Sequence, residues 1–153
     1  MITQAEYEEI FRLPKFYTGR KRLFYPPQGE VTLFDVSTQD GMIFQVDIRN
    51  MSRKSLGLQL WKSTYQERYE KTMVMARLDI GHGQHTNPDG TIVSGNHLHL
   101  YHEKYNDHVA IPLPENFSKL LSNKLSLIKE FFCFCHIEFP PEKWSVGLDY
   151  ENI

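Results

Sequence analysis

The sequence has little of what marks secreted, membrane-spanning or nucleic-acid-coating proteins. It contains only 2 cysteines, which excludes a disulfide-stabilised scaffold. No apolar run approaches the roughly 18 residues of a membrane span, and the first residues, MITQAEYEEIFRLPKF, include acids but no apolar stretch typical of a secretory signal. With 17 Lys+Arg against 19 Asp+Glu the net charge is -2, which excludes a strongly basic DNA-coating protein. We therefore expect a cytoplasmic protein.

The chain is apolar enough to form one folded domain. Its 153 residues are 41% hydrophobic and include 10 Phe and 8 Tyr, so a real core can be buried and general disorder is excluded. The length fits one domain over 1–153. Cys133 and Cys135 lie two apart near a predicted helix end, where their side chains diverge. We interpret both as small buried apolar residues in a reducing compartment.

The pattern of apolar residues predicts a helix at each end of the domain. The first covers 3–12, where Thr3 and Glu6 fit a capping box. The second covers about 117–135, carries one apolar stripe and is capped by Asn116 or Ser118. The tail 138–153, with Pro140 and Pro141, is expected to be an irregular extension.

Short segments of strand character fill the middle of the chain and follow one another without long helical spacers. They are 22–26, 31–36, 42–48, 56–61, 72–80, 96–103 and 108–113. This order predicts a single α+β domain with a mainly antiparallel, twisted sheet of about six strands. The N-terminal helix precedes the sheet, and the long C-terminal helix packs on one face of it.

Histidines are concentrated in one stretch: five of the seven fall between 82 and 102. At period two, Leu98 and Leu100 point towards the core, so the opposite face of this strand carries His97, His99, Tyr101 and Glu103.

The same alternation in 72–80 leaves Arg77 and Asp79 on the outer face. If the two strands are neighbours, these side chains and the histidines share one patch. The connection 81–95, which holds His85 and Asn87, is long for a hairpin, and such loops are often functional.

Our first hypothesis is a metal-independent ribonuclease of toxin or host-takeover type. Histidine suits proton transfer at neutral pH, and arginine is a preferred partner for phosphate. His85 and His99 would transfer protons, while His97 and Arg77 would hold the phosphate. The remaining site residues are Asp79 and Glu103 as orienters or electrostatic partners, Tyr101 as a hydrogen-bond donor to phosphate or a base-stacking ring, and Asn87 as a binding residue in the loop.

The expected partner of such an enzyme is RNA, and a cognate inhibitor protein would accompany a toxin. Four cations could follow the phosphate backbone despite the near-neutral total charge: Lys62, Arg68, Lys71 and Lys104. No cofactor is needed in this hypothesis.

Three alternatives stay open. In one, His85, His97, His99 and Glu103 bind a divalent transition metal such as Zn. In another, the protein is a non-enzymatic inhibitor, of antidefence type, that docks on a host nucleic-acid-processing protein through exposed tyrosines. In the plainest, the histidines are simply solvated on the wet face of an antiparallel sheet.

The run from about 63 to 117 resembles an uncharacterised family of small bacterial proteins met in phage and mobile-element neighbourhoods. STYQERY (63–69), ARLDIGHGQHTNPDG (76–90) and HLHLYHEKYNDHVAIPLP (97–114) carry the resemblance. The family pattern has an Arg-Leu-Asp stretch, a His-Thr-Asn-Pro-Asp-Gly loop and a His-x-His-x-Tyr-x-Glu strand. It maps onto Arg77, Asp79, His85, Asn87, Pro88, His97, His99, Tyr101 and Glu103.

This sequence departs from the family pattern at Gln84, where Pro is usual, and at His102, where Lys or Arg is typical. The resemblance implies no function. The pairing of an Arg-x-Asp strand with a His-x-His strand is also similar to small sheet-based ribonuclease toxins, a likeness of architecture.

Overall fold

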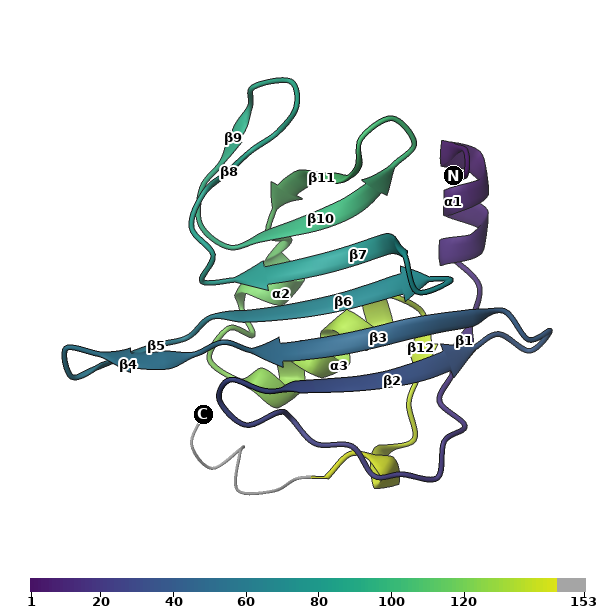
Figure 1. Ribbon diagram of the computed structural model, residues 1–153, viewed down its shortest axis with the longest axis horizontal. Helices are drawn as coiled ribbons and strands as arrows, with labels where there is room; N and C mark the ends of the chain where they lie inside the picture. The colour runs from purple at the N-terminus through teal and green to yellow at the C-terminus, as the bar shows by residue number, and fades with distance from the viewer. Residues whose placement is uncertain (146–153) are drawn as a thin grey trace.

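The computed structural model describes residues 1–145, apart from the side chains of 53, 55 and 59. Its main feature is an eight-stranded sheet in the order β11-β10-β7-β6-β3-β2-β1-β12 (Figure 1). Every neighbouring pair is antiparallel except β1 with β12. The predicted α+β class with a mainly antiparallel sheet is confirmed, although the sheet has more strands than expected.

The sheet strands are β1 (Lys15–Phe16), β2 (Val31–Ser37), β3 (Ile43–Asn50), β6 (Ser63–Tyr69), β7 (Met73–Ile80), β10 (His97–His102), β11 (Asn106–Pro112) and β12 (Ile137–Glu138). Two hairpins are separate from it, β4 (Arg53–Ser55) with β5 (Leu58–Leu60) and β8 (His85–Thr86) with β9 (Ile92–Val93). The helices are α1 (Gln4–Phe11), α2 (Glu115–Ser118), α3 (Lys124–Phe134) and the 3-10 turn η1 (Pro141–Lys143).

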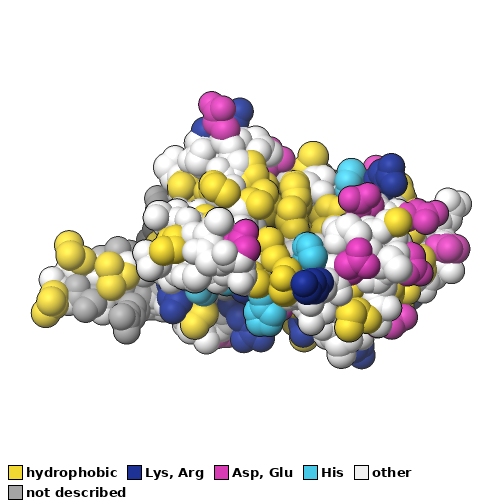
Figure 2. Space-filling model, turned by 90° about the horizontal axis from the view of Figure 1, so that it is seen from above, with side chains coloured by type: hydrophobic (Ala, Val, Ile, Leu, Met, Phe, Trp, Pro, Cys, Tyr) yellow, Lys and Arg dark blue, Asp and Glu magenta, His cyan; other side chains and the backbone are white. Residues whose placement is uncertain are grey.

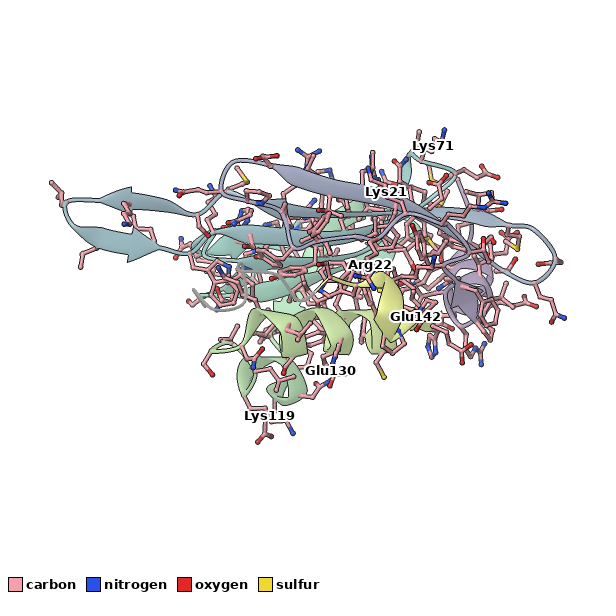
Figure 3. The ribbon with its side chains drawn as sticks, turned by 90° about the horizontal axis from the view of Figure 1, so that it is seen from below. Lys21, Arg22, Lys71, Lys119, Glu130 and Glu142 are labelled. Atoms are coloured by element: carbon pink, nitrogen blue, oxygen red, sulfur yellow. The ribbon has the colours of Figure 1, made fainter. Side chains whose placement is uncertain are left out.

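One face of the sheet is covered by helices, and the core lies between them. Seen from below, α2, α3 and η1 all lie on the same side of the strands (Figure 3). Leu78 and Leu98 on the sheet and Leu127 and Phe131 on α3 are fully buried in this core. Within residues 1–145, no helix lies over the opposite face, and it is there that the polar side chains of β7 and β10 lie.

The predicted first helix is confirmed with its cap. The Thr3 side chain accepts from the backbone of Glu6, and the Glu6 side chain accepts from the backbone of Thr3, as a capping box requires. The helix is tied to the sheet because the Tyr7 hydroxyl donates to the carbonyl of Met75.

The single long helix predicted over 117–135 is wrong. The chain forms α2, turns, and starts again as α3, because the Asn123 side chain accepts from the backbone N–H of Ser126 and so begins a new helix. The predicted caps at Asn116 and Ser118 are accordingly wrong too. Pro114 precedes α2, and Asn123 caps α3.

Two strand predictions also need correction. Segment 22–26 makes only an isolated bridge, between Leu23 and Trp144. Conversely β6, a central strand, was not predicted, because its sequence STYQERY carries a glutamate on the core face. Glu67 is tolerated there because Lys15, equally buried, lies 3.4 Å from it.

The ammonium of Lys15 also holds two helix ends together. It donates to the carbonyl oxygens of Phe11, at the end of α1, and of Cys135, at the end of α3.

The cysteines and the C-terminal tail differ from expectation in part. Both cysteines are free, but only Cys135 is buried, and Cys133 is exposed. The tail contains β12 and η1 rather than being irregular throughout, and its last part, 146–153, lies outside the described residues. Within 1–145, none of the helices has the length and apolarity needed to cross a membrane.

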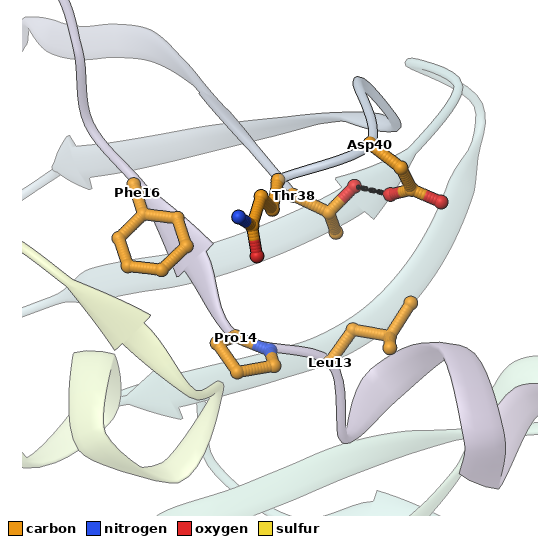
Figure 4. Close-up of a pocket in the computed structure, with 6 residues that line it drawn as sticks. Leu13, Pro14, Phe16, Thr38 and Asp40 are labelled. Carbon is orange, nitrogen blue, oxygen red and sulfur yellow. Dashed lines mark hydrogen bonds between the residues drawn. The ribbon is translucent and has the colours of Figure 1, made fainter.

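Two surface features lie away from the histidine-rich strands. A cavity of about 380 Å³ lies between the segment after α1 and the turn after β2, where Thr38 donates to Asp40 (Figure 4). The β4–β5 hairpin projects from the sheet and exposes Leu56, Leu58 and Leu60, seen as the apolar end at the left of Figure 2. Neither feature includes a residue of the predicted site.

Candidate functional site

The register of β7 and β10 brings the predicted outer-face residues together. His97 lies opposite Asp79, and His99 lies opposite Arg77. Alternate residues of a strand share a face, so these four side chains lie on the face without helices. The predicted common patch of Arg77, Asp79, His97 and His99 is confirmed.

The long connection 81–95 folds as the β8–β9 hairpin and adds a third histidine to the patch. The ring centroid of His85 lies 4.6 Å from that of His99 and 5.5 Å from that of His97. The Asn87 amide fixes the hairpin to the edge strand, since it donates to the carbonyl of Ala110 and accepts from its N–H. Asn87, predicted as a binding residue, thus positions the hairpin.

Gly81 lets the chain leave β7 towards this hairpin. Its φ of +77° lies in the left-handed region, and a Cβ there would collide with the carbonyl oxygen of Trp61. Its N–H donates to the side chain of Asn96, which closes the base of the connection. Glycine is required here by both the left-handed φ and the close approach of the Trp61 carbonyl.

His97 and His99 of β10 are buried, which is contrary to the alternative in which these histidines are simply solvated. His97 is 2% exposed and His99 is 1% exposed, while His85 is half-buried. The physical reason is the hairpin, which lies against β11 and closes over the patch. Seen from above, histidine atoms reach the surface only in small separate areas (Figure 2).

One nitrogen of each imidazole in this cluster is held by a backbone carbonyl. Nδ1 of His97 lies 2.9 Å from the oxygen of Gly95, and Nδ1 of His99 lies 2.7 Å from that of Asp107. Nε2 of His85 lies 2.8 Å from the oxygen of His108. A carbonyl can only accept, so each of these nitrogens carries a proton. In His97 and His99 the second ring nitrogen, Nε2, faces Asp79.

The three rings offer ligand atoms that lie close together, and those of His97 and His99 lie beside a carboxylate. One ligand atom from each of His85, His97 and His99 lies within 4.8 Å of the others. Oδ2 of Asp79 lies 3.3 Å from Nε2 of His99 and 3.5 Å from Nε2 of His97. Within the described part of the chain, no group forms a well-directed hydrogen bond with the buried Nε2 of His99.

An ion pair with Arg77 orients the Asp79 carboxylate, and a second ion pair holds Arg77 itself. Arg77 Nε lies 3.3 Å from its Oδ1, and the Arg77 guanidinium also donates to Asp107 at 2.7 Å. Burial by itself would raise the pKa of Asp79, but its interaction with the His99 ring and the charge of Arg77 outweigh this and lower the pKa below its usual value. Asp79 is therefore ionised at neutral pH.

Tyr101 and Glu103 do not join the cluster. A register shift between Leu100 and His102 disrupts the alternation of β10, and Tyr101 instead donates to the carbonyl of Ile2 and packs on the Tyr7 ring. Glu103 lies exposed in the turn that follows, where its N–H donates to Gln4. The period-two argument was wrong beyond Leu100 because it assumed a regular strand.

The four predicted backbone-tracking cations are dispersed. Arg68 is engaged by Asp47 and Gln45, which neutralises much of its charge. Lys71 and Lys104 lie in turns at the far ends of β7 and β10 from Asp79 and His97. Lys62 alone lies near the Asp79 end of β7, because it precedes Ser63, which pairs with Ile80.

Neither His82 nor His102 belongs to the group of three histidines. His82 contacts the hydroxyl of Thr64 and the carbonyl of Ser63, and burial lowers its pKa. His102 accepts from the N–H of Lys104. The important residue that sequence reasoning missed is Asp107, whose carbonyl holds His99 and whose carboxylate holds Arg77. Asp107 lies on β11, whereas the strand predicted from the sequence began only at 108, so the pattern did not single it out.

Comparison with known proteins gives one match. A family model matches residues 2–137, and its description is a family of unknown function (DUF6978). No curated protein and no solved structure matches the chain significantly. The predicted membership of an uncharacterised family is confirmed at this level, and the association with phage and mobile elements stays a prediction.

Proposed function

Because the chain belongs to DUF6978, a family of unknown function, we propose a function from its site: the protein binds one divalent transition metal through His85, His97 and His99. The observation that carries the proposal is the orientation of the rings. Each of the three has one nitrogen on a backbone carbonyl, and one ligand atom from each ring lies within 4.8 Å of the others.

This arrangement matches what metal-binding histidines require. A ligating imidazole almost always donates its second ring N–H to a carbonyl or carboxylate, which fixes the tautomer and the ring direction. Here all three rings do so. Imidazole ligands suit Zn, Cu, Fe and Ni, whereas Mg and Ca prefer oxygen. Zn is the metal we expect, and Glu103 is removed from the proposed ligand set because it lies outside the cluster.

The same geometry is less favourable to metal-independent RNA cleavage. A general acid or base must come within about 2.6–3.2 Å of the substrate atom that exchanges the proton. Nε2 of His99 is buried beneath the hairpin, and Arg77 is already paired with two carboxylates. The ribonuclease hypothesis thus stays a prediction that requires the hairpin to open, and it ranks behind metal binding. Docking on a host protein also stays a prediction.

Calorimetric titration of untagged, chelator-stripped protein with Zn²⁺ tests the proposal. We expect one equivalent to bind, and we expect His85→Ala to weaken binding by more than about 100-fold, since loss of a ligand exceeds the effect of losing a supporting hydrogen bond. The matched control is His102→Ala, a histidine outside the cluster, which should bind as the wild type does. Absence of wild-type binding, or equal binding by the two variants, would refute the proposal.

The same samples test the ribonuclease hypothesis. Cleavage of structured RNA that is unaffected by EDTA and lost in His99→Ala would support proton transfer by the histidines. Cleavage that EDTA abolishes would assign the reaction to the metal.

A further inference from the structure

Three imidazoles leave one position of a tetrahedral metal open, and the identity of its occupant separates a catalytic from a structural centre. Resting on the metal site proposed above, we propose that Asp79 is the fourth ligand. The metal would then be held by three nitrogen atoms and one carboxylate oxygen. In that case it acts as a cross-link between the hairpin and the sheet.

The distances from Asp79 are those expected between ligands of one metal. With metal–ligand bonds of about 2.0–2.1 Å, two ligand atoms of a tetrahedron lie about 3.3 Å apart. Oδ2 of Asp79 lies 3.3 Å from Nε2 of His99 and 3.5 Å from Nε2 of His97. One carboxylate oxygen therefore stands at a tetrahedral edge from two imidazole nitrogens at once.

Asp79 lies beside the ring nitrogens that would bind the metal, and not beside those that a supporting carboxylate would bind. A carboxylate that orients a ligating histidine binds the ring nitrogen that faces away from the metal. For His97 and His99 that nitrogen is Nδ1, which the carbonyls of Gly95 and Asp107 already occupy. Asp79 instead lies beside both Nε2 atoms, the nitrogens that would bind the metal.

A cation would satisfy the polar atoms at this point. Nδ1 of both rings is on a carbonyl, so a metal would be bound through Nε2, and both Nε2 atoms lie beside Oδ2 of Asp79. These three atoms face one another in a buried position, and Nε2 of His99 has no well-directed hydrogen bond within the described residues. Buried polar groups are costly without partners. A divalent cation among them satisfies all three.

The other carboxylate oxygen is used to hold Asp79 in place. Oδ1 lies 3.3 Å from Nε of Arg77 and 3.5 Å from the hydroxyl of Thr64. The Asp107 carboxylate accepts a hydrogen bond from the same arginine, and the Asp107 backbone carbonyl accepts one from His99. This leaves Oδ2 directed to the centre of the cluster, with its neighbours fixed in position.

A closed shell has a consequence for the fold. Asp79 lies on β7, His97 and His99 lie on β10, and His85 lies on the hairpin. Apart from the metal, the Asn87 amide and the His85 ring bond this hairpin to β11. The metal would join all three segments from within and hold the hairpin closed.

Replacement of Zn²⁺ by Co²⁺ tests the ligand directly, because the visible absorption of Co²⁺ reports coordination number and ligand type. We expect an intense tetrahedral spectrum for the wild type. In Asp79→Asn we expect a changed spectrum and affinity for Co²⁺ reduced by about 100-fold or more. The matched control is Asp107→Asn, which loosens Arg77 but removes no ligand, so its spectrum should be that of the wild type.

A second variant is expected to add an absorption band rather than to weaken Co²⁺ binding. Asp79→Cys would place a thiolate on the metal and add a sulfur-to-cobalt charge-transfer band, with the two natural cysteines present equally in the wild-type reference. Absence of this band, together with a wild-type spectrum in Asp79→Asn, would overturn the assignment of Asp79 while leaving the three-histidine site intact. Failure of the wild type to bind either metal would instead refute the proposed function.

Discussion

The buried pair of Glu67 and Lys15 predicts an unusual dependence of stability on pH. Burial raises the pKa of Glu67 from 4.5 to about 7, and the attraction of Lys15 offsets only part of this. The folded protein therefore holds this proton more tightly than the unfolded chain does. The stabilising contribution is complete below pH 4.5 and is lost as the pH rises through about 7.

The size of the effect follows from the shift. One pKa unit corresponds to about 1.4 kcal/mol, and the difference between 4.5 and about 7 is about 2.5 units. The free energy of unfolding should thus fall by up to the order of 3 kcal/mol between pH 4.5 and 8 through this group alone. Burial lowers the pKa values of His82 and His136, which acts in the opposite direction near pH 6.

Urea unfolding at a series of pH values measures this, with the double variant Lys15→Met/Glu67→Gln as comparator. The double variant removes both charges at once, so neither position titrates, while the contribution of His82 remains and cancels in the difference. The charge of Lys15 also lowers the pKa of His136, so the part of the His136 contribution that is due to Lys15 is removed with it and does not cancel. We expect wild-type stability to decline with rising pH relative to the double variant. Parallel curves, or a relative gain in wild-type stability, would refute the account of this pair.

Two further predictions concern the construction of the site. In metal-free protein, His99→Ala should cost roughly 2–4 kcal/mol in thermal unfolding, because it empties a buried position and orphans a carbonyl. His85→Ala should cost about 1 kcal/mol or less, because that ring is half-buried; equal costs would show that the burial argument is wrong. Gly81→Ala should cost more than about 2 kcal/mol, whereas Gly83→Ala, also at positive φ but with open space around it, should cost about 1 kcal/mol. Similar losses for the two alanines would mean that the contact with Trp61 does not matter.

Alternation of polar and apolar residues was enough to predict the composition of the outer face. Leu98 and Leu100 required the core, and this placed His97 and His99 opposite. The same reasoning failed at Tyr101, because a β-bulge is a local irregularity that no periodic pattern contains.

Burial of the cluster could not be predicted from the pattern. The sequence indicated that 81–95 was a functional connection, but its direction depends on contacts made far along the chain. Asn87 binds Ala110, and His85 binds the carbonyl of His108, both 23 residues away. Without these contacts His97 and His99 would be the solvated residues that strand alternation suggests.

The errors in secondary structure have similar causes. β6 was missed because a buried glutamate is unfavourable unless a partner is present, and that partner, Lys15, is 52 residues distant. The helix of 117–135 was drawn through Asn123 because the apolar stripe continues on both sides of it. The helix itself is interrupted there, because the Asn123 side chain caps a new helix, α3.

Anomalous diffraction at the zinc absorption edge, from crystals of the zinc-reconstituted protein, tests the central claim most directly. The account predicts one strong peak under the β8–β9 hairpin, within bonding distance of a ring nitrogen from each of His85, His97 and His99. A map without a peak at that position would contradict it.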